Sequence, residues 1–518
     1  MATLLEVGIC GLVLLTTGIS VSFVVEQLLR PRPHLRSRYA PAFAVHAGVW
    51  LLVFGVALAV WQRPLFGTGL VTAGMLLVVL VSNAKFAALR EPFLLSDFRF
   101  FIALLRHPRL YLPFFGVLPA IGCAIFFVAL CVFALRIEPS LAAKMGAIPF
   151  VFSCLMIVIA GATLMWVGAL KHLPVTLDPG RDLQSFGLIG SLVRYWQEEG
   201  ANDPQRFAEK LNGIQVQPRA SRSQKDAHIV AVQCESFFDA RRVFDGVSPA
   251  VLKNFDALSK SASQAGRLNV PAWGANTVRT EFAFLSGIAP AALGVHQFNP
   301  YRKLARFGVP TIASELKKQG YRTICVHPFS AKFYDRDKVF PALGFDEFID
   351  IAAFVSADRS GPYIGDAAVA KKVSELLAVA TVPLFIFVIT MENHGPLNQE
   401  RVAEGDQARL YVDAPPDGYD EFTVYLRHLQ HTDAMLGTIY DALQATSRRG
   451  WLCAYGDHVP ILSGVYDASA FTDGRTDYLI VGPSTENIVG HKANIVDIAP
   501  EELAASLLNT AGYHLAKK

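Results

Sequence analysis

Two patterns of hydrophobic residues divide the chain. In the first third the apolar residues form long runs, and from Ala227 onward they form short runs that alternate with longer mixed segments. A run of roughly 20 apolar residues is long enough to cross the hydrocarbon core of a bilayer. Short apolar runs separated by helical patterns are typical of an α/β domain with a mostly parallel central sheet. The sequence therefore predicts a multi-span α-helical membrane domain followed by an α/β domain.

The membrane domain is expected over residues 1–172, with about five helices. The first apolar run has no clear small-residue cleavage site and is followed by four more, which favours a retained helix over a removable signal peptide. Residues 173–225 are expected to form an interfacial helix and a linker, and residues 226–518 the α/β domain. The expected spans are Leu4–Leu29, Phe43–Trp61, Leu65–Val81, Leu112–Leu135 and Ile148–Leu170.

The α/β domain contains short apolar runs that predict strands and mixed segments that predict helices. The expected strands are His228–Cys234, Thr323–Val326, Leu384–Thr390, Trp451–Tyr455 and Tyr478–Val481. The expected helices are Val251–Ala265, Pro310–Gln319, Asp366–Ala380 and Asp420–Thr446.

Composition supports this division and excludes some functions. Apolar residues make up 52% of the chain and charged residues 18%, which is low for a soluble protein. The net charge of +3, with no concentrated basic run, argues against nucleic acid as a partner. The seven cysteines form no Cys-x-x-Cys pair, so they are expected to be small core residues rather than ligands of a structural zinc.

Charge near the apolar runs bears on the side of the membrane. Basic residues crowd the loops after the first and third runs, and the positive-inside rule places such loops in the cytoplasm. Five crossings would then leave the α/β domain inside as well. A missed crossing or a re-entrant segment over residues 92–105 would change the count. The basic residues concerned are Arg30, Arg32, Arg36, Arg38, Lys85, Arg90, Arg99, Arg106 and Arg109.

Ionisable side chains follow four of the expected strands. Glu235 follows the first and His327 the second, His394 comes four residues after the third, and Asp457 and His458 follow the fourth. In open α/β sheets, ligands bind at the carboxyl ends of the strands. One such residue is most often structural, but four strand ends that carry metal-ligand residue types indicate a site.

Three of these side chains suit a divalent ion. Glu235, Asp457 and His458 offer carboxylate oxygens and an imidazole, which are ligands for Mn²⁺ or Zn²⁺. Thr277 opens an expected helix, where its hydroxyl can face an ion, lose its proton more easily and act as a nucleophile. The alternative is that Thr277 or Asn276 simply caps that helix.

The same residues resemble the motifs of a known family. Glu235-Ser236-Phe237, Thr277 four residues before Glu281-Phe282, and Gly456-Asp457-His458 resemble the motifs of lipoteichoic acid synthases and related phosphoglycerol transferases of the alkaline phosphatase/sulfatase superfamily. The resemblance implies a sulfatase-like fold. It also implies that Glu235, Thr277, Asp457 and His458 bind one divalent ion, with Mn²⁺ favoured over Zn²⁺ or Mg²⁺, and that Thr277 is the nucleophile.

A further match concerns the substrate. His327, followed by Tyr334 and Arg336, resembles the family's substrate-binding residues at the same spacing, and His394 matches its active-site histidine. The family usually has Trp where Tyr334 stands, which bears on the identity of the head group. Arg336 is expected to grip phosphate bidentately, and His394 to stabilise phosphate or protonate the leaving group.

The resemblance implies transfer of phosphoglycerol from a membrane phospholipid, such as phosphatidylglycerol, to a glycan or other hydroxyl acceptor through a phosphothreonine-type intermediate. It places the chain in a bacterial inner (cytoplasmic) membrane, with the catalytic domain on the periplasmic or extracellular side. That placement conflicts with the charge bias, and we give the chemistry more weight.

Several alternatives stay open from the sequence. A phosphoethanolamine transferase would share the ion and the threonine, but such proteins usually carry disulfides, and the soluble-domain cysteines here lie in separate apolar runs. A true sulfatase needs a Cys/Ser-x-Pro-x-Arg motif, which the sequence lacks. A phosphodiester hydrolase, in which water replaces the acceptor, and an inactive membrane scaffold are the remaining alternatives.

Overall fold

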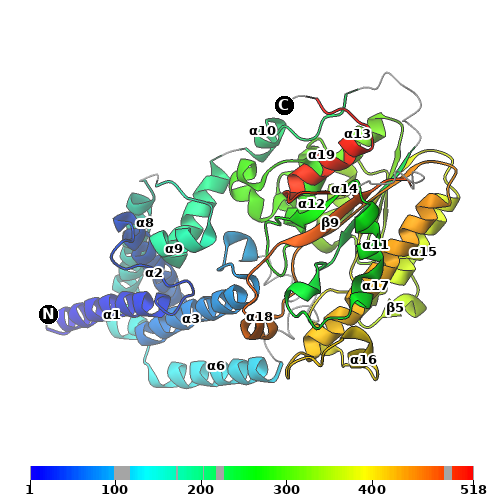
Figure 1. Ribbon diagram of the computed structural model, residues 1–518. Coiled ribbons are helices and arrows are strands. Elements are labelled where there is room, and N and C mark those ends of the chain that lie inside the picture. Colours follow the sequence, from blue (N-terminus) through cyan, green and yellow to red (C-terminus); the bar gives the residue numbers. More distant parts are fainter. Residues whose placement is uncertain are drawn as a thin grey trace. The chain divides into compact units, whose positions relative to one another are not determined.

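The computed structural model describes residues 2–98, 117–170, 173–201, 203–217, 227–483 and 493–516. The chain divides into two compact units, Met1–Ala201 and Asn202–Lys518. The first unit is helical and the second contains the large sheet (Figure 1). This confirms the predicted order of an apolar helical part and an α/β part.

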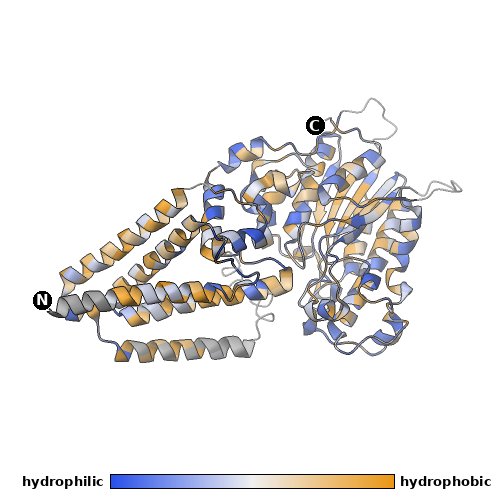
Figure 2. Cartoon of the chain, turned by 60° about the vertical axis from the view of Figure 1, so that its left-hand side comes forward, coloured by the Kyte–Doolittle hydropathy of each residue, from blue (hydrophilic) through white to orange (hydrophobic). Residues whose placement is uncertain are grey.

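Long apolar helices occupy the predicted spans. They are α1 (Ala2–Glu26), α2 (Ala40–Trp61), α3 (Pro64–Leu89), α6 (Val117–Ile137) and α8 (Ala147–Leu170). Within the described residues, α2, α3 and α8 are long and apolar enough to cross a membrane. Figure 2 shows that hydrophobic residues predominate along these helices. Residues 112–116 of the fourth expected span, and 99–105 of the expected re-entrant segment, lie outside the described residues.

Glycines permit the close packing of α2 against α8. Gly48 and Gly55 lie two turns apart on α2, and Gly161 and Gly168 are spaced in the same way on α8. A Cβ atom on Gly48 would lie 2.4 Å from the backbone nitrogen of Met165, so the two backbones approach too closely for any side chain. Small residues at helix contacts are typical of packing inside membranes.

One arginine of the first basic loop is buried in an ion pair. The guanidinium of Arg38 contacts the carboxylate of Glu26, and both side chains are fully buried. The backbone N–H of Leu188 donates to the other carboxylate oxygen of Glu26 at 2.8 Å. Arg38 therefore has a structural role as the partner of Glu26, whose carboxylate connects the end of α1 to the helix α9 (Pro179–Gly200).

The segment predicted as an interfacial helix and a linker contains two helices. α9 (Pro179–Gly200) is capped by Asp178 and bends at Gly187, whose φ is 69°. It belongs to the first unit. The predicted linker contains the short helix α10 (Pro204–Glu209), so this part of it has regular structure, and residues 218–226 lie outside the described residues.

The second unit is built on an eight-stranded sheet of order β10-β2-β9-β8-β1-β7-β3-β4. The neighbouring strands β8, β1, β7, β3 and β4 are parallel, and β9 runs antiparallel to both β8 and β2. The five predicted strands are confirmed as β1 (His228–Cys234), β3 (Arg322–Val326), β7 (Leu384–Ile389), β8 (Gly450–Gly456) and β9 (Thr476–Val481).

Three strands of this sheet were not predicted. They are β2 (Gln264–Leu268), β4 (Glu347–Ile349) and β10 (Asn494–Ile495). β2 carries glycine, glutamine and arginine instead of β-branched residues, so its strand conformation depends on pairing with β9. For this reason the helix predicted over Val251–Ala265 is too long, and α11 ends at Ser261.

Both faces of the sheet are covered by helices. Val230, Val232 and Cys234 of β1 pack into a core with α11 (Lys253–Ser261), α15 (Asp366–Ala378) and α17 (Asp420–Gln444). The alternate β1 residues pack on the other face against α12 (Thr277–Ser286), α13 (Ile312–Lys318) and α19 (Pro500–Thr510). Burial on both faces explains why β1 is a continuous apolar run.

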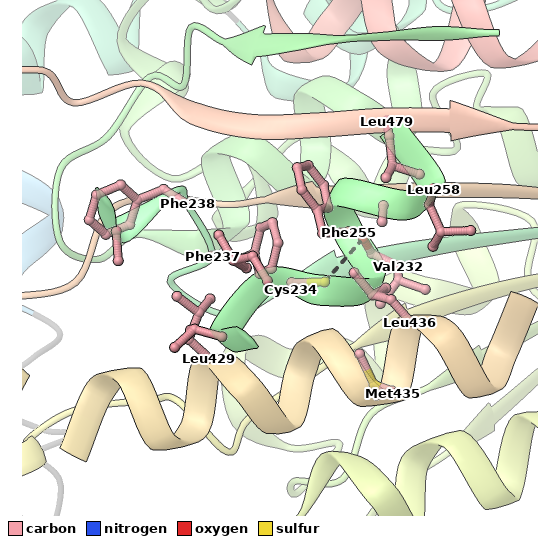
Figure 3. Close-up of a cluster of buried hydrophobic side chains, with 14 of the residues drawn as sticks. Val232, Cys234, Phe237, Phe238, Phe255, Leu258, Leu429, Met435, Leu436 and Leu479 are labelled. Atoms are coloured by element: carbon pink, nitrogen blue, oxygen red, sulfur yellow. Dashed lines mark hydrogen bonds between the residues drawn. The ribbon is translucent and has the colours of Figure 1, made fainter. Parts of the chain in front are cut away.

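Residues at the end of β1 and residues of α17 belong to the same hydrophobic core. In Figure 3, Val232 and Cys234 of β1 lie beside Phe237 and Phe255, and beside the α17 residues Leu429, Met435 and Leu436. Cys234, Cys325 and Cys453 are free and fully buried, as predicted for small core residues, and Cys131 is only partly buried. The end of β1 and the adjacent turns of α17 are thus fixed in one rigid body.

We predict that Gly456→Ala destabilises the fold. A Cβ atom at this position would lie 1.8 Å from the carbonyl oxygen of Phe237, and backbone atoms cannot yield as a flexible side chain can. Overpacking of this kind costs about 1–3 kcal/mol or more. The measurement is the melting temperature of the full-length protein in detergent.

The matched control is Gly464→Ala. Gly464 lies in α18 (Ser463–Ser469), and a Cβ there would meet no heavy atom within 4 Å. Its melting temperature is expected to stay at or above that of the wild type, since alanine favours helix. Equal melting temperatures for the two variants would contradict the close approach at Gly456.

Candidate metal centre and active site

The parallel pairing of β1 with β8 brings the first group of site residues together. Cys234 lies opposite Gly456 at the carboxyl ends of these strands, so the next residues, Glu235 and Asp457, are neighbours. Ligand atoms of Glu235, Asp457 and His458 all lie within 4.8 Å of one another, and the three side chains are buried. The structure thus brings together three of the four predicted ion ligands.

The orientation of Asp457 suits a cation. Its Oδ1 accepts hydrogen bonds from the backbone N–H groups of Ser236 and His458, each at 2.9 Å. Its Oδ2 is buried and has no hydrogen-bond partner among the described residues, and it lies 3.2 Å from Nε2 of His458. A buried carboxylate oxygen without a partner is costly. A divalent ion at this position would satisfy it.

The charges of these side chains also favour a bound cation. Burial and the nearby carboxylate of Asp457 raise the pKa of Glu235 well above its usual value, while His458 opposes the shift. Two buried carboxylates beside one imidazole carry excess negative charge. A bound cation would stabilise both carboxylates in their ionised form.

The predicted nucleophile lies at the start of α12. Thr277 is the first residue of this helix, and Asn276 before it has a φ of 69° and makes no side-chain capping hydrogen bond. One turn later, the hydroxyl of Thr280 donates to the backbone carbonyl of Asp457 at 2.8 Å. The first turn of α12 therefore packs on a predicted ion ligand, and Asn276 occupies the N-cap position without a side-chain capping hydrogen bond.

Two predicted substrate residues, Arg336 and His327, contact each other, and a third side chain binds Arg336. Nε and Nη2 of Arg336 bind the two carboxylate oxygens of Glu281, at 3.2 and 2.8 Å, and Arg336 Nη1 lies 3.3 Å from Nε2 of His327. The hydroxyl of Tyr301 donates to the same carboxylate at 2.6 Å. The bidentate edge of Arg336 is thus occupied by Glu281. Contact with a phosphate group is left to Nη1.

The other two predicted substrate residues lie in aromatic surroundings. The backbone of Tyr334 has a φ of 58°. Its ring lies 5.3 Å from the guanidinium of Arg336 and 4.5 Å from the ring of Phe333. His394 Nδ1 lies 2.7 Å from the carbonyl of Gly395, and its ring lies 5.5 Å from that of Tyr363. Burial lowers the pKa of His394.

Some residues around this site were not predicted from the sequence. The hydroxyl of Thr390 accepts from the backbone N–H of Glu235 at 2.9 Å, and the hydroxyl of Ser236 donates to the Glu235 carboxylate at 3.0 Å. Serine and threonine are too common after strands for such contacts to be read from spacing.

A second group of ligand-type side chains was also missed. Glu392, His428 and His431 form a further candidate group for a metal ion. The signal in the sequence was His428-x-x-His431, which places two imidazoles one turn apart on the predicted helix Asp420–Thr446.

The sequence of the second unit matches a model of a known protein family. The model described as Sulfatase matches residues 227–513, which is more than half of the chain. The chain belongs to the sulfatase family. The matched region of this sulfatase-family chain contains all of the predicted site residues.

One relative extends the similarity into the helical part. The capsular polysaccharide biosynthesis protein RkpI of Rhizobium meliloti is 29% identical over 482 residues, which are 89% of this chain and 86% of that protein. The lipoteichoic acid synthase of Staphylococcus aureus is 25% identical over 215 residues, 38% of this chain and 32% of the synthase. The predicted resemblance to lipoteichoic acid synthases is thereby confirmed.

A solved structure is also similar to this chain. The phosphoglycerol transferase GacH of Streptococcus pyogenes, in complex with sn-glycerol-1-phosphate, has a TM-score of 0.45 and 23% identity, covering 61% of this chain and 80% of that one.

We predict that Glu281→Gln strongly destabilises the sulfatase-family domain. Arg336 and Glu281 are almost fully buried, and removing one partner leaves the other charge uncompensated. Breaking a buried pair in this way costs about 3–5 kcal/mol. The measurement is thermal unfolding of the full-length protein.

The control is Glu347→Gln, which breaks the exposed pair between Glu347 and Arg322. Exposed pairs contribute about 0–1 kcal/mol, so its melting temperature is expected to stay close to the wild-type value. A similar small effect of Glu281→Gln would show that Arg336 does not depend on Glu281.

Proposed function

We propose that this protein transfers phosphoglycerol from an anionic membrane phospholipid to a hydroxyl group of a glycan, with Thr277 as the nucleophile. The observation that carries the proposal is the joint placement of two elements. Glu235, Asp457 and His458 form a buried group of ligand atoms, and the helix that begins at Thr277 is hydrogen-bonded to the backbone of Asp457.

The residues divide the chemistry between them. A divalent ion held by Glu235, Asp457 and His458, with Mn²⁺ favoured, would neutralise phosphoryl charge and lower the pKa of the Thr277 hydroxyl. The Thr277 hydroxyl loses its proton and Oγ1 forms a bond to phosphorus while the bond to the diacylglycerol oxygen breaks, and that oxygen takes up a proton as diacylglycerol leaves. The acceptor hydroxyl then loses its proton and attacks phosphorus, the bond to Thr277 breaks, Oγ1 regains a proton, and phosphoglycerol passes to the acceptor.

Side chains near the site can guide the protons and the phosphate. A carbonyl only accepts hydrogen bonds, so Nδ1 of His394 donates to Gly395 and the lone pair of the neutral ring lies on Nε2. We assign Nε2 of His394 the task of taking the proton of the acceptor hydroxyl in the second step. Arg336 Nη1 and His327 are proposed to contact the phosphoglycerol group.

The helical part supports a donor that lies in the membrane. Helices that can cross a membrane would hold the domain close to phospholipid head groups. We propose that the domain lies on the periplasmic or extracellular side of the cytoplasmic membrane. The name of the relative RkpI, a capsular polysaccharide biosynthesis protein, supports a glycan as the acceptor.

Replacing Thr277 tests the nucleophile. Thr277→Ala removes the only atom that forms the bond to phosphorus in the proposal, so diacylglycerol release from labelled phosphatidylglycerol with added Mn²⁺ is expected to fall at least about 10³-fold. Thr277→Ser keeps a hydroxyl and is expected to retain measurable turnover. Release by Thr277→Ala at a rate near that of the wild type would remove Thr277 from the mechanism.

A mixed-lipid experiment tests the head group. The purified protein is given equal amounts of phosphatidylglycerol and phosphatidylethanolamine, each with a labelled head group, together with a glycan acceptor. Labelled phosphoglycerol is expected on the acceptor. Transfer of phosphoethanolamine instead would leave the site and the nucleophile in place but change the donor.

A further inference from the structure

Two ring nitrogens converge on one carboxylate oxygen outside the group described above. Nδ1 of His428 lies 3.0 Å from Oε1 of Glu392, and Nδ1 of His431 lies 2.6 Å from the same atom. Glu392 and His428 are about 1% exposed, whereas the side chain of His431 is 40% exposed. The group is therefore buried on one side and open to solvent on the other.

Rigid elements hold the three side chains. His428 and His431 lie one turn apart on α17, which packs on the sheet through Leu429 and Leu436 (Figure 3). Glu392 follows β7, and its Oε2 accepts from the backbone N–H of Asp366 at 2.6 Å. The relative positions of these ligand atoms thus depend on the core rather than on a flexible loop.

The remaining nitrogen of His428 has the partner expected of a metal ligand. Nε2 lies 2.9 Å from a carboxylate oxygen of Glu400, whose other oxygen accepts from Arg427 at 2.9 Å. Histidines that bind metals almost always donate their second ring N–H to a carboxylate, carbonyl or water, which orients the ring. Glu400 occupies that position here.

A further buried carboxylate lies beside the group. Asp366 is fully buried, and its Oδ1 has no hydrogen-bond partner among the described residues. Its Oδ2 accepts from the hydroxyl of Thr432, the residue after His431, at 2.6 Å. Asp366 thus contacts Glu392 through its backbone and Thr432 of α17 through its side chain. With Glu392 and Glu400, it gives three carboxylates around two imidazoles.

We propose that Glu392, His428 and His431 bind a second divalent ion of the zinc type, in addition to the ion at Glu235, Asp457 and His458. Two imidazoles and one carboxylate are a known ligand set for zinc, and they leave a fourth position for water. Tetrahedral bonds of about 2.0–2.1 Å place ligand atoms roughly 3.3 Å apart. Each of the two histidine nitrogens therefore needs to move away from Oε1 of Glu392 by less than about 1 Å to admit the ion.

The ion would also fix part of the predicted active site. Glu392 stands two residues before His394 in the segment that follows β7. An ion bound to Glu392 would anchor this segment to α17, which carries the two histidines.

The test counts metal ions per chain. Full-length protein in detergent is stripped with a chelator, reloaded with Zn²⁺, freed of excess ion and measured by elemental mass spectrometry. The wild type is expected to hold two ions. His431→Gln is expected to hold one, Asp457→Asn one, and the double variant none.

The matched control is His514→Gln. His514 is exposed and belongs to neither group, so this variant is expected to keep two ions. Two ions retained by His431→Gln, or one ion in the wild type that is lost with Asp457→Asn, would overturn the proposal. One ion in the wild type that is lost with His431→Gln would instead support this site and count against the first.

Anomalous diffraction at the zinc edge on wild-type crystals gives an answer that does not depend on how the variants fold. A peak coordinated by Glu392, His428 and His431 supports the proposal. A peak at Glu235, Asp457 and His458 with none at the second group overturns it.

Discussion

The parallel pairing of β1 with β8 concentrates negative charge in a buried place, and the rest of the site is arranged around it. Because Cys234 lies opposite Gly456, the chain leaves both strands at the same edge with a carboxylate next in sequence. Backbone N–H groups stabilise one oxygen of Asp457, but its other oxygen lacks a partner among the described residues. The fold thus holds two carboxylates at a separation that is unfavourable without a cation. A divalent ion would resolve that conflict and would supply the chemistry that the proposed phosphoryl transfer requires.

The sequence predicted this convergence because parallel strands place their carboxyl ends at one edge, so residues that follow different strands become neighbours. It predicted β1 to the residue, since a strand buried on both faces is a continuous apolar run. It did not predict β2, whose polar residues form a strand through pairing with β9. The local pattern of apolar and polar residues predicts which segments are buried, but it does not predict which distant segments pair with each other.

The sequence was also limited in predicting the contacts of the site residues. Arg336 was expected to grip phosphate with its bidentate edge, but that edge binds Glu281, a residue 55 positions earlier in the chain. The group of Glu392 and the two α17 histidines also depends on contacts across the fold, although the spacing of His428 and His431 was visible in the sequence. Residue types at strand ends predict where chemistry gathers, whereas the partners of each side chain come from packing.

The central claim is that Thr277 carries the transferred group. The most direct measurement is mass spectrometry of the protein after incubation with mixed phospholipids and Mn²⁺ in the absence of an acceptor, followed by peptide mapping. The account predicts a phosphoglycerol adduct on the peptide that contains Thr277, lost on addition of a hydroxyl acceptor. An adduct on another residue, or turnover of lipid with no adduct on Thr277 at any time point, would contradict it.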